Sequence, residues 1–261
     1  MKQKTIYYED ELNDEFSGEA PRKTIKIDGD FEYIKRSPFW NLCAFFAYRA
    51  IMVPFAFIYN KLVLRQKFIN KSCLKKSRGG GYFVYANHTL KAGDAFIPNM
   101  LNMPRKTYTI VHPDNISLKG AKNFILMNGA IPLPSTATAT KNFMEAIEKR
   151  VVEGNAIQIY PEAHIWPYYT KIRPFKAISF RYPVKLDEAV YCFTNTFHKR
   201  KFCKKPKVIT YVDGPFYPNK ELSPKEQEQD LRDRVYETMC KRAELNTYEF
   251  IKYERKEKKD D

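Results

Sequence analysis

From Gly79 onward the chain alternates between short runs rich in β-branched and aromatic residues and longer segments with helical periodicity. Five of these runs are expected to be strands, at residues 82–85, 107–111, 156–160, 189–193 and 208–212. Residues 141–152 carry apolar side chains at four-residue spacing and end before Gly154, which predicts a helix with a glycine cap. Ser223 to Glu226 form a capping box that opens another helix. The alternation predicts an α/β domain over residues 79–250, with a mixed, mainly parallel sheet flanked by helices.

An apolar stretch upstream of this domain, residues 39–58, is about as long as a membrane span of ~20 residues. Arg49 and Pro54 argue against a crossing, because a central arginine costs about 2.5–3.5 kcal/mol on insertion scales and an interior proline kinks a helix. We therefore expect residues 23–78 to be an amphipathic, membrane-docking helical segment, interfacial or shallowly re-entrant, whose basic stretch 61–78 binds anionic head groups. A core helix of a soluble domain and a full membrane span are the alternatives.

The two ends of the chain are polar and charged. Residues 1–22 are acidic and predict a mobile arm without a secretory signal, which favours a reducing, cytosol-facing location. Residues 251–261 are of mixed charge and predict a solvated tail. The five cysteines are scattered, which argues against a disulfide framework or a zinc site. With 45 Lys and Arg against 30 Asp and Glu, the formal charge of +15 predicts an anionic partner: phospholipid, nucleic acid or a phosphorylated ligand.

Two polar segments follow predicted strands. In the first, a carboxylate of Asp94 that accepts a hydrogen bond from one imidazole nitrogen of His88 would leave the other nitrogen to take a proton from a substrate hydroxyl. This is the base and orienter of a Ser-His-Asp triad, with the substrate's alcohol in place of the serine. In the second, Glu162 and His164 are expected at the same sheet edge as His88, where ligands collect in open α/β sheets. The alternative is that Glu162 caps the next helix and His164 is an ordinary surface residue.

Together the two segments resemble the glycerolipid acyltransferase family typified by bacterial 1-acylglycerol-3-phosphate acyltransferases. That family's first block reads Asn-His-x4-Asp, matched by Asn87 and His88, and its third reads Phe-Pro-Glu-Gly-Thr-Arg, matched by residues 160–162. Residues 118–132 are similar to its second block, and the resemblance covers about residues 61–213.

The resemblance implies an O-acyltransferase of phospholipid biosynthesis, peripheral or monotopic on the cytoplasmic face of the membrane. Its reaction would move a fatty acyl group from a thioester, acyl-CoA or acyl carrier protein, to a hydroxyl of a lysophospholipid-type acceptor such as lysophosphatidic acid. In family terms His88 is the general base and Asp94 its orienter. Neither a metal nor a cofactor is implied beyond the acyl-donor substrate.

The chain departs from the family pattern in three places. Five residues separate His88 from Asp94 where the family has four, so the loop must bulge for the dyad to form, helped by Gly93. The arginines that end the second and third blocks are absent, with residues 133–135 and 163–165 in their places. Those arginines contact the glycerophosphate, so either other groups recognise the phosphate or the acceptor is not lysophosphatidate. The candidate substrate-binding residues are Asn87, Thr89, Glu162, His164, Lys171, Arg173 and Lys176.

Two other functions stay open. A catalytically inactive, peripheral membrane lipid-binding protein would have the same fold. A basic nucleic-acid-binding protein would stack bases on aromatic residues between its lysines. Because the most apolar segment lies beside the most basic one, the pattern suits a bilayer better than a nucleic acid. We therefore expect an anionic membrane surface, an acyl donor and a lysophospholipid-type acceptor as partners, and no nucleic acid.

Overall fold

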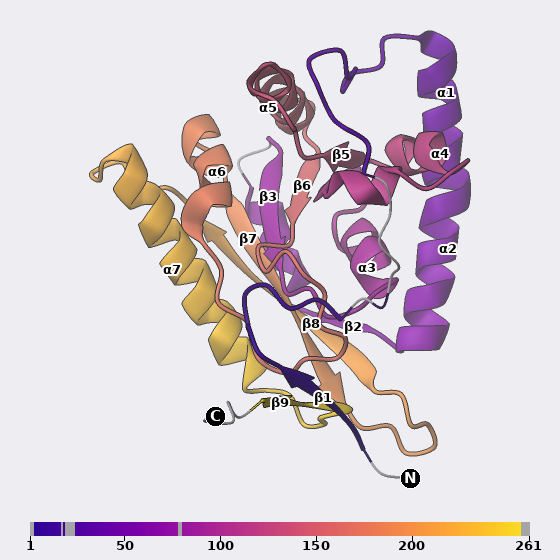
Figure 1. The fold of residues 1–261 in the computed structure, drawn as a ribbon, viewed down its shortest axis with the longest axis vertical. Helices are drawn as coiled ribbons and strands as arrows, with labels where there is room; N and C mark the ends of the chain where they lie inside the picture. The colour runs from indigo at the N-terminus through magenta and orange to yellow at the C-terminus, as the bar shows by residue number, and fades with distance from the viewer. Residues whose placement is uncertain (1–2, 17, 19–23, 78–79, 257–261) are drawn as a thin grey trace, which may run out of the picture.

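The computed structural model describes residues 3–16, 18, 24–77 and 80–256 and has two sheets with helices packed around the larger one (Figure 1). The strands are β1 (Lys4–Tyr8), β2 (Lys67–Ile69), β3 (Tyr82–Ala86), β4 (Thr107–Val111), β5 (Ala130–Pro132), β6 (Ala156–Ile159), β7 (Val190–His198), β8 (Lys207–Phe216) and β9 (Ile251–Arg255). The α-helices are α1 (Pro38–Phe46), α2 (Val53–Ile58), α3 (Gly93–Leu101), α4 (Lys122–Met127), α5 (Ala137–Val152), α6 (Arg181–Leu186) and α7 (Pro224–Ala243). Shorter helical turns are η1 (Ala47–Met52), η2 (Tyr59–Leu64), η3 (Lys71–Lys76), η4 (Pro113–Ile116) and η5 (Ala177–Phe180).

The larger sheet has seven strands in the order β2-β8-β7-β3-β6-β4-β5. Every neighbouring pair is parallel except β7 and β8, which form a long antiparallel hairpin. The predicted mixed, mainly parallel α/β sheet flanked by helices is therefore confirmed. All five predicted strands are present, and the capping box at Ser223 opens α7 as expected. The predicted helix at 141–152 begins four residues earlier, where the Thr136 side chain accepts a hydrogen bond from the amide of Ala139.

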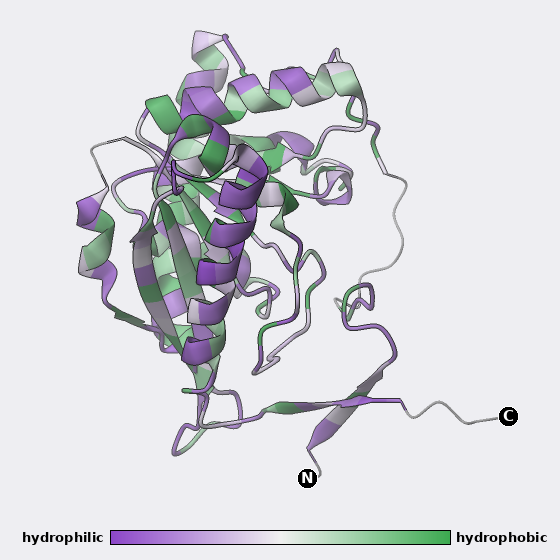
Figure 2. Ribbon diagram, turned by 90° about the vertical axis from the view of Figure 1, so that its left-hand side faces the viewer, coloured by the Kyte–Doolittle hydropathy of each residue, from purple (hydrophilic) through white to green (hydrophobic). Residues whose placement is uncertain are grey.

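The central strand β3 is buried on both faces and divides two apolar cores. Phe83 and Tyr85 pack with side chains of α5, α6 and α7. Tyr82 and Val84 point the other way, toward α3, η2 and η3. Figure 2 looks at the molecule from the α7 side, where the outer surface of this helix is mostly hydrophilic and the sheet behind it is more apolar. The carboxyl end of β3 is thus held rigidly between two layers, which fixes the position of the residues that follow it.

The apolar segment forms one continuous helix from Pro38 to Leu64 along the side of the domain (Figure 1). The helix continues through Pro54, because the turns before it widen to a π-helix and the amide of Val53 reaches the carbonyl of Tyr48. By length and composition this helix could cross a membrane. Its inner face packs on α3, where the Tyr48 hydroxyl donates to Asn99 Oδ1 at 2.7 Å. Its outer face exposes Phe39, Leu42, Phe45, Phe46, Ile51, Phe55, Phe57, Ile58, Leu62 and Val63.

The predicted mobile arm and solvated tail need correction. Residues 4–8 pair in parallel with residues 251–255 as a separate two-stranded sheet, and the chain from residue 9 to 16 lies against the domain. The indole of Trp166 is fully buried there and donates a hydrogen bond to the Asp14 carbonyl at 2.7 Å. Phe16 packs edge-on against this ring, and Tyr253 stacks on it. The acidic composition of the arm conceals these aromatic contacts, which offset the entropy lost on ordering it. Residues 19–22 of the arm, Arg78 and residues 257–261 lie outside the described part of the chain.

Candidate active site

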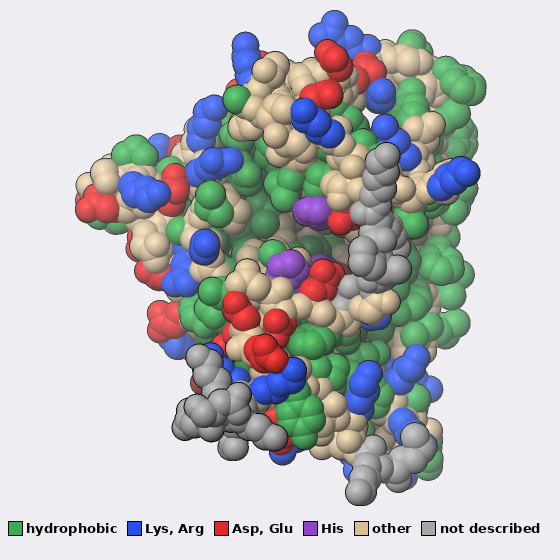
Figure 3. All heavy atoms as spheres, in the orientation of Figure 1, with side chains coloured by type: hydrophobic (Ala, Val, Ile, Leu, Met, Phe, Trp, Pro, Cys, Tyr) green, Lys and Arg blue, Asp and Glu red, His purple; other side chains and the backbone are tan. Residues whose placement is uncertain are grey.

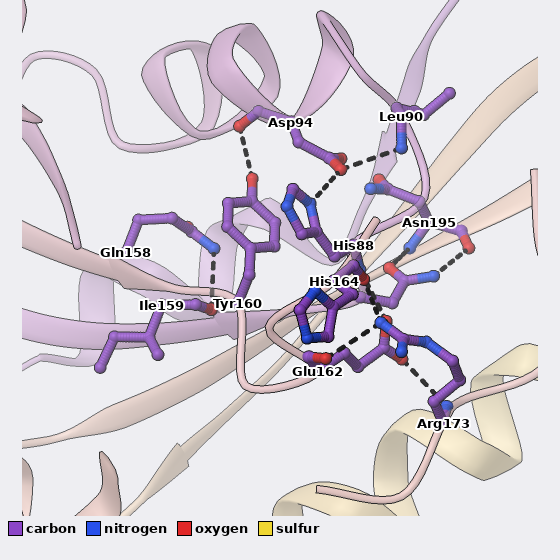
Figure 4. Close-up of polar contacts among 11 residues, drawn as sticks. His88, Leu90, Asp94, Gln158, Ile159, Tyr160, Glu162, His164, Arg173 and Asn195 are labelled. Carbon is purple, nitrogen blue, oxygen red and sulfur yellow. Dashed lines mark hydrogen bonds and ion pairs between the residues drawn. The ribbon is translucent and has the colours of Figure 1, made fainter. Parts of the chain in front are cut away.

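The strand β3 and the first turn of α3 bring the predicted dyad together. His88 follows the carboxyl end of β3, and its Nδ1 lies 2.8 Å from Oδ2 of Asp94 (Figure 4). The same carboxylate oxygen accepts a hydrogen bond from the amide of Leu90 at 2.9 Å. Asp94 is buried, whereas the His88 side chain is 23% exposed. The pair is therefore anchored at its aspartate and open to solvent at its histidine.

The extra residue between His88 and Asp94 is absorbed by a helical turn. The amide of Asp94 donates to the Leu90 carbonyl at 2.8 Å, so the loop closes as the first turn of α3. Gly93 contributes by its missing side chain, since a Cβ there would lie 2.8 Å from Cβ of Leu90 and 3.2 Å from Cδ1 of Leu64. Glycine suits this position because of close packing, and not because of the conformational freedom that a bulge would require.

Two opposing effects act on the pKa of the Asp94 carboxyl. Burial raises the pKa of the Asp94 carboxyl, because a charged group is poorly solvated there. The hydrogen bond and charge of His88 and the amide of Leu90 lower that pKa in opposition. Only one carboxylate oxygen is engaged, and Oδ1 has no hydrogen-bond partner. Asp94 is thus directed at His88 Nδ1, which fixes the imidazole so that Nε2 faces outward.

Tyr160 fixes the plane of the His88 ring. The two rings are stacked with centroids 4.5 Å apart and planes 23° apart. The Tyr160 hydroxyl donates to the backbone carbonyl of Asp94, which ties the end of β6 to the start of α3. Burial raises the pKa of Tyr160 well above its usual value, so the residue remains a neutral phenol. Tyr160 stands where the family block has phenylalanine, and its hydroxyl gives it a positioning role that the motif does not reveal.

Glu162 and Arg173 form a buried pair behind the dyad (Figure 4). Glu162 accepts hydrogen bonds from the backbone amides of His88 and Arg173, each at 3.0 Å. The Arg173 guanidinium is fully buried, donates to the carbonyls of Glu162 and His164, and lies over the Trp166 ring with its Cζ 4.9 Å from the centroid. Burial raises the pKa of Glu162. This pair joins the loops after β3 and β6 and so supports the dyad, and Glu162 also lines the cleft in front of His88.

Like Arg173, three other predicted substrate-binding residues do not line the cleft in front of His88. The Asn87 side chain is buried and exchanges hydrogen bonds with the backbone of Asn195, at 3.0 and 2.8 Å. Thr89 is fully buried. Lys171 is exposed but does not line the cleft beside His88. The amides of His88 and Leu90 already donate to Glu162 and Asp94, so neither is left to stabilise an oxyanion.

A cleft of about 1350 Å³ opens in front of His88. Figure 3 shows the hollow in the middle of this face, with histidine and acidic side chains at its centre. Among the predicted residues, His164 and Lys176 line it together with the dyad and the edge of Glu162. The His164 Nδ1 lies 3.6 Å from the Glu15 carboxylate, so this imidazole already faces an acid. No group of three or more His, Cys, Asp or Glu in the described residues is arranged to hold a metal ion.

Several residues of the cleft lack a motif that would have identified them. Lys91 and Arg181 add positive charge to its lining. Apolar walls come from β4, α4, β6 and η5, and Met52 of the long helix also reaches it. The segment from Leu12 to Glu15 contributes to the rim. In the sequence, Arg181 belongs to a series of basic residues from 171 to 181. Nothing in that series indicates which of its members lines the cleft.

Ala163 occupies a backbone conformation that favours glycine. Its φ is 63°, at the position where the resembled block has glycine. We expect Ala163→Gly to stabilise the protein by about 0.5–1 kcal/mol. The left-handed conformation costs a residue with a Cβ ~1–2 kcal/mol, and glycine removes this cost. Part of the gain is cancelled because glycine increases the conformational entropy of the unfolded chain. Urea denaturation measures the difference. Ala137→Gly, at the right-handed start of α5, is the control and is expected to be neutral or destabilising. An equal loss of stability in both variants would show that the backbone at Ala163 is not strained.

The comparisons with known proteins give a structural likeness and no match in sequence. A scan against protein-family models finds no match, and a search of curated proteins finds none. Among solved structures, the chain is similar to the crystal structure of the 1-acyl-sn-glycerophosphate (LPA) acyltransferase, PlsC, from Thermotoga maritima, at 17% sequence identity and a TM-score of 0.49. The match covers 82% of this chain and 98% of that chain.

Proposed function

We propose that this protein is an O-acyltransferase that works at a membrane surface. The observation that carries the proposal is the His88–Asp94 contact of 2.8 Å, with the second imidazole nitrogen facing the cleft. In the described residues, no serine, threonine or cysteine side chain makes a hydrogen bond with His88. The nucleophile therefore has to come from the substrate, and an alcohol is the group that such a base activates.

The reaction follows from this geometry. His88 Nε2 takes the proton of the acceptor hydroxyl while Asp94 stabilises the imidazolium through Nδ1. The acceptor oxygen forms a bond with the thioester carbonyl carbon, the carbon–sulfur bond breaks, and the proton passes from His88 to the departing sulfur. A thioester donor, acyl-CoA or acyl carrier protein, is the class proposed. No covalent acyl-enzyme is needed.

The lining of the cleft supports a lipid acceptor. Its apolar walls fit a fatty acyl chain, and Lys176 and Arg181 provide charge for an anionic head group. Met52 lines the cleft and belongs to the long helix, whose outer face is apolar. We propose that this face lies in the bilayer interface, with the helix parallel to the membrane, because its inner face is packed against α3. A lysophospholipid then reaches His88 from the membrane side.

The test is acyl transfer by the purified full chain on liposomes. Long-chain acyl-CoA and acyl carrier protein are offered with lysophosphatidate, zwitterionic lysophospholipids and monoacylglycerol, and products are identified by mass spectrometry. We expect transfer to at least one lysophospholipid. Absence of transfer from both donors to every acceptor would overturn the proposal and leave the inactive lipid-binding alternative.

A matched pair of lysines tests how the head group is bound. Lys176→Ala is expected to raise KM for an anionic acceptor about tenfold, since a charged hydrogen bond contributes ~1.5–3 kcal/mol. Lys171→Ala is the control, because Lys171 is exposed outside the cleft. Equal KM values in the two variants would show that Lys176 does not contact the acceptor.

A further inference from the structure

The turn between β7 and β8 concentrates positive charge around an exposed aromatic ring. Residues 199–207 contain six Lys and Arg and no acidic residue. Phe202, at the tip, is 90% exposed, the most of any large apolar side chain among the described residues. The ammonium of Lys201 lies 5.2 Å from the centroid of this ring. Scattered exposed apolar residues are common on soluble proteins, but Phe202 is set apart by the cations around it.

This turn is joined to the end of the long apolar helix. The Arg200 guanidinium donates hydrogen bonds to the carbonyl of Val63, in the last turn of η2, and to the carbonyl of Pro206 at 2.8 Å. Figure 1 shows the turn below the end of this helix. Leu62 and Val63 are exposed there. Exposed cations follow at Arg65 and Lys67. The Phe202 ring thus lies near the end of the apolar helix face, with a band of cations close to both.

We propose that the β7–β8 turn is a second membrane-binding element, in which Phe202 inserts at the level of the lipid head groups and the cations around it bind anionic phospholipid. The proposal rests on the proposed docking of the long helix in the same bilayer. An aromatic ring suits the interface, and each cation near an anionic surface strengthens binding about fivefold. A nucleic acid or an acidic protein would satisfy the charge, but the bilayer also accounts for the turn's attachment to the end of an apolar helix face.

The second contact has a geometric consequence. A single helix in the interface leaves its axis able to tilt relative to the membrane. A second contact at the end of the helix holds that end at the membrane surface and limits the tilt. Because both contacts are on one rigid chain, the second adds to the first as an intramolecular binding event.

Insertion is tested directly by an indole at the tip of the turn. Phe202→Trp is made together with Trp40→Phe, which leaves Trp166 as the other indole, and Trp166 is fully buried. On vesicles of phosphatidylcholine and phosphatidylglycerol, we expect a blue shift of fluorescence and quenching by bromine-labelled lipid. If the protein floats with the vesicles but the new indole is not quenched, the turn proposal fails while helix docking stands. If the wild type does not float, both fail.

The charge contribution is tested by two pairs of lysines. Lys199→Gln/Lys205→Gln removes two exposed cations from the turn, and Lys225→Gln/Lys241→Gln removes two from α7. The first pair is expected to weaken partitioning onto anionic vesicles roughly 25-fold, with little change on phosphatidylcholine alone, and the second to have a much smaller effect. Equal losses in the two pairs would contradict the proposal. So would unchanged vesicle binding with loss of binding to a single-stranded oligonucleotide at physiological salt.

Discussion

Replacing His88 by alanine is expected to lower kcat for acyl transfer by about 10²- to 10⁴-fold, the usual contribution of a positioned general base. The ring makes one polar side-chain contact, with Asp94, and one stacking contact, with Tyr160. Its loss therefore removes the base with little effect on the fold. Initial rates on liposomes measure the effect, with thermal unfolding and flotation showing that the variant is folded and membrane-bound. Transfer within tenfold of the wild-type rate would contradict the assignment of His88 as the base.

Asp94→Asn is the companion variant and separates orientation from chemistry. Oδ2 of Asp94 contacts both His88 Nδ1 and the Leu90 amide, so the asparagine has two possible placements. With its oxygen there it keeps both hydrogen bonds but not the negative charge, and with its NH₂ there it loses the hydrogen bond from Leu90. Either placement removes the charge that stabilises the imidazolium, so kcat should fall. Because burial penalises the charged carboxyl, as the raised pKa shows, the variant should be at least as stable as the wild type. A folded, inactive Asp94→Asn protein would identify Asp94 as the orienter.

Arg173→Ala is expected to destabilise the protein by about 3–5 kcal/mol, because it leaves Glu162 buried without its counter-charge. The guanidinium also donates to the Glu11 carbonyl at 3.2 Å, so the segment beside the cleft loses an anchor. Urea denaturation measures the loss, if the variant folds well enough to show a cooperative transition. The comparison variant is Glu162→Gln, which removes the charge but retains an acceptor for one of the two amides. We expect a smaller loss, ~1–3 kcal/mol.

A double-mutant cycle keeps this prediction testable when Arg173→Ala is poorly folded. Arg173→Met retains much of the apolar volume over Trp166. Combined with Glu162→Gln, it should cost less than the sum of the single changes, with a coupling energy of 0.5–3 kcal/mol. Additive losses would show that the two side chains act independently. Effects on KM without effects on stability would restore the substrate-binding role predicted from the sequence.

The central strands and the dyad could be predicted because their signals are local. Residues 82–86 are a continuous run of apolar and aromatic residues, and residues 156–159 are apolar except for Gln158, as expected for strands covered on both faces. His88 lies two residues after the first run, so strand geometry predicts its place at the sheet edge. The three-residue strands β2 and β5 are too short to show any periodicity.

The role of charged residues could not be predicted in the same way. Lys171 and Arg173 are two residues apart in one basic segment, yet the first is exposed and the second fully buried. What separates them is the Trp166 ring and the carbonyls around it, and this is a tertiary arrangement. The pairing of residues 4–8 with residues 251–255 was equally hidden, because neither strand has a partner near it in sequence.

That last pairing has a consequence for the order of events during synthesis. Lys4 cannot meet Ile251 until translation has passed that residue, which at 5–20 residues per second is roughly 10–50 s after Lys4 itself is made. Until then, nothing in the two-stranded sheet holds the segment that places Leu12, Asn13 and Glu15 at the rim of the cleft. The pairing of β1 with β9 is therefore among the last contacts of the fold that can form, because it follows the synthesis of the strands and helices around the dyad.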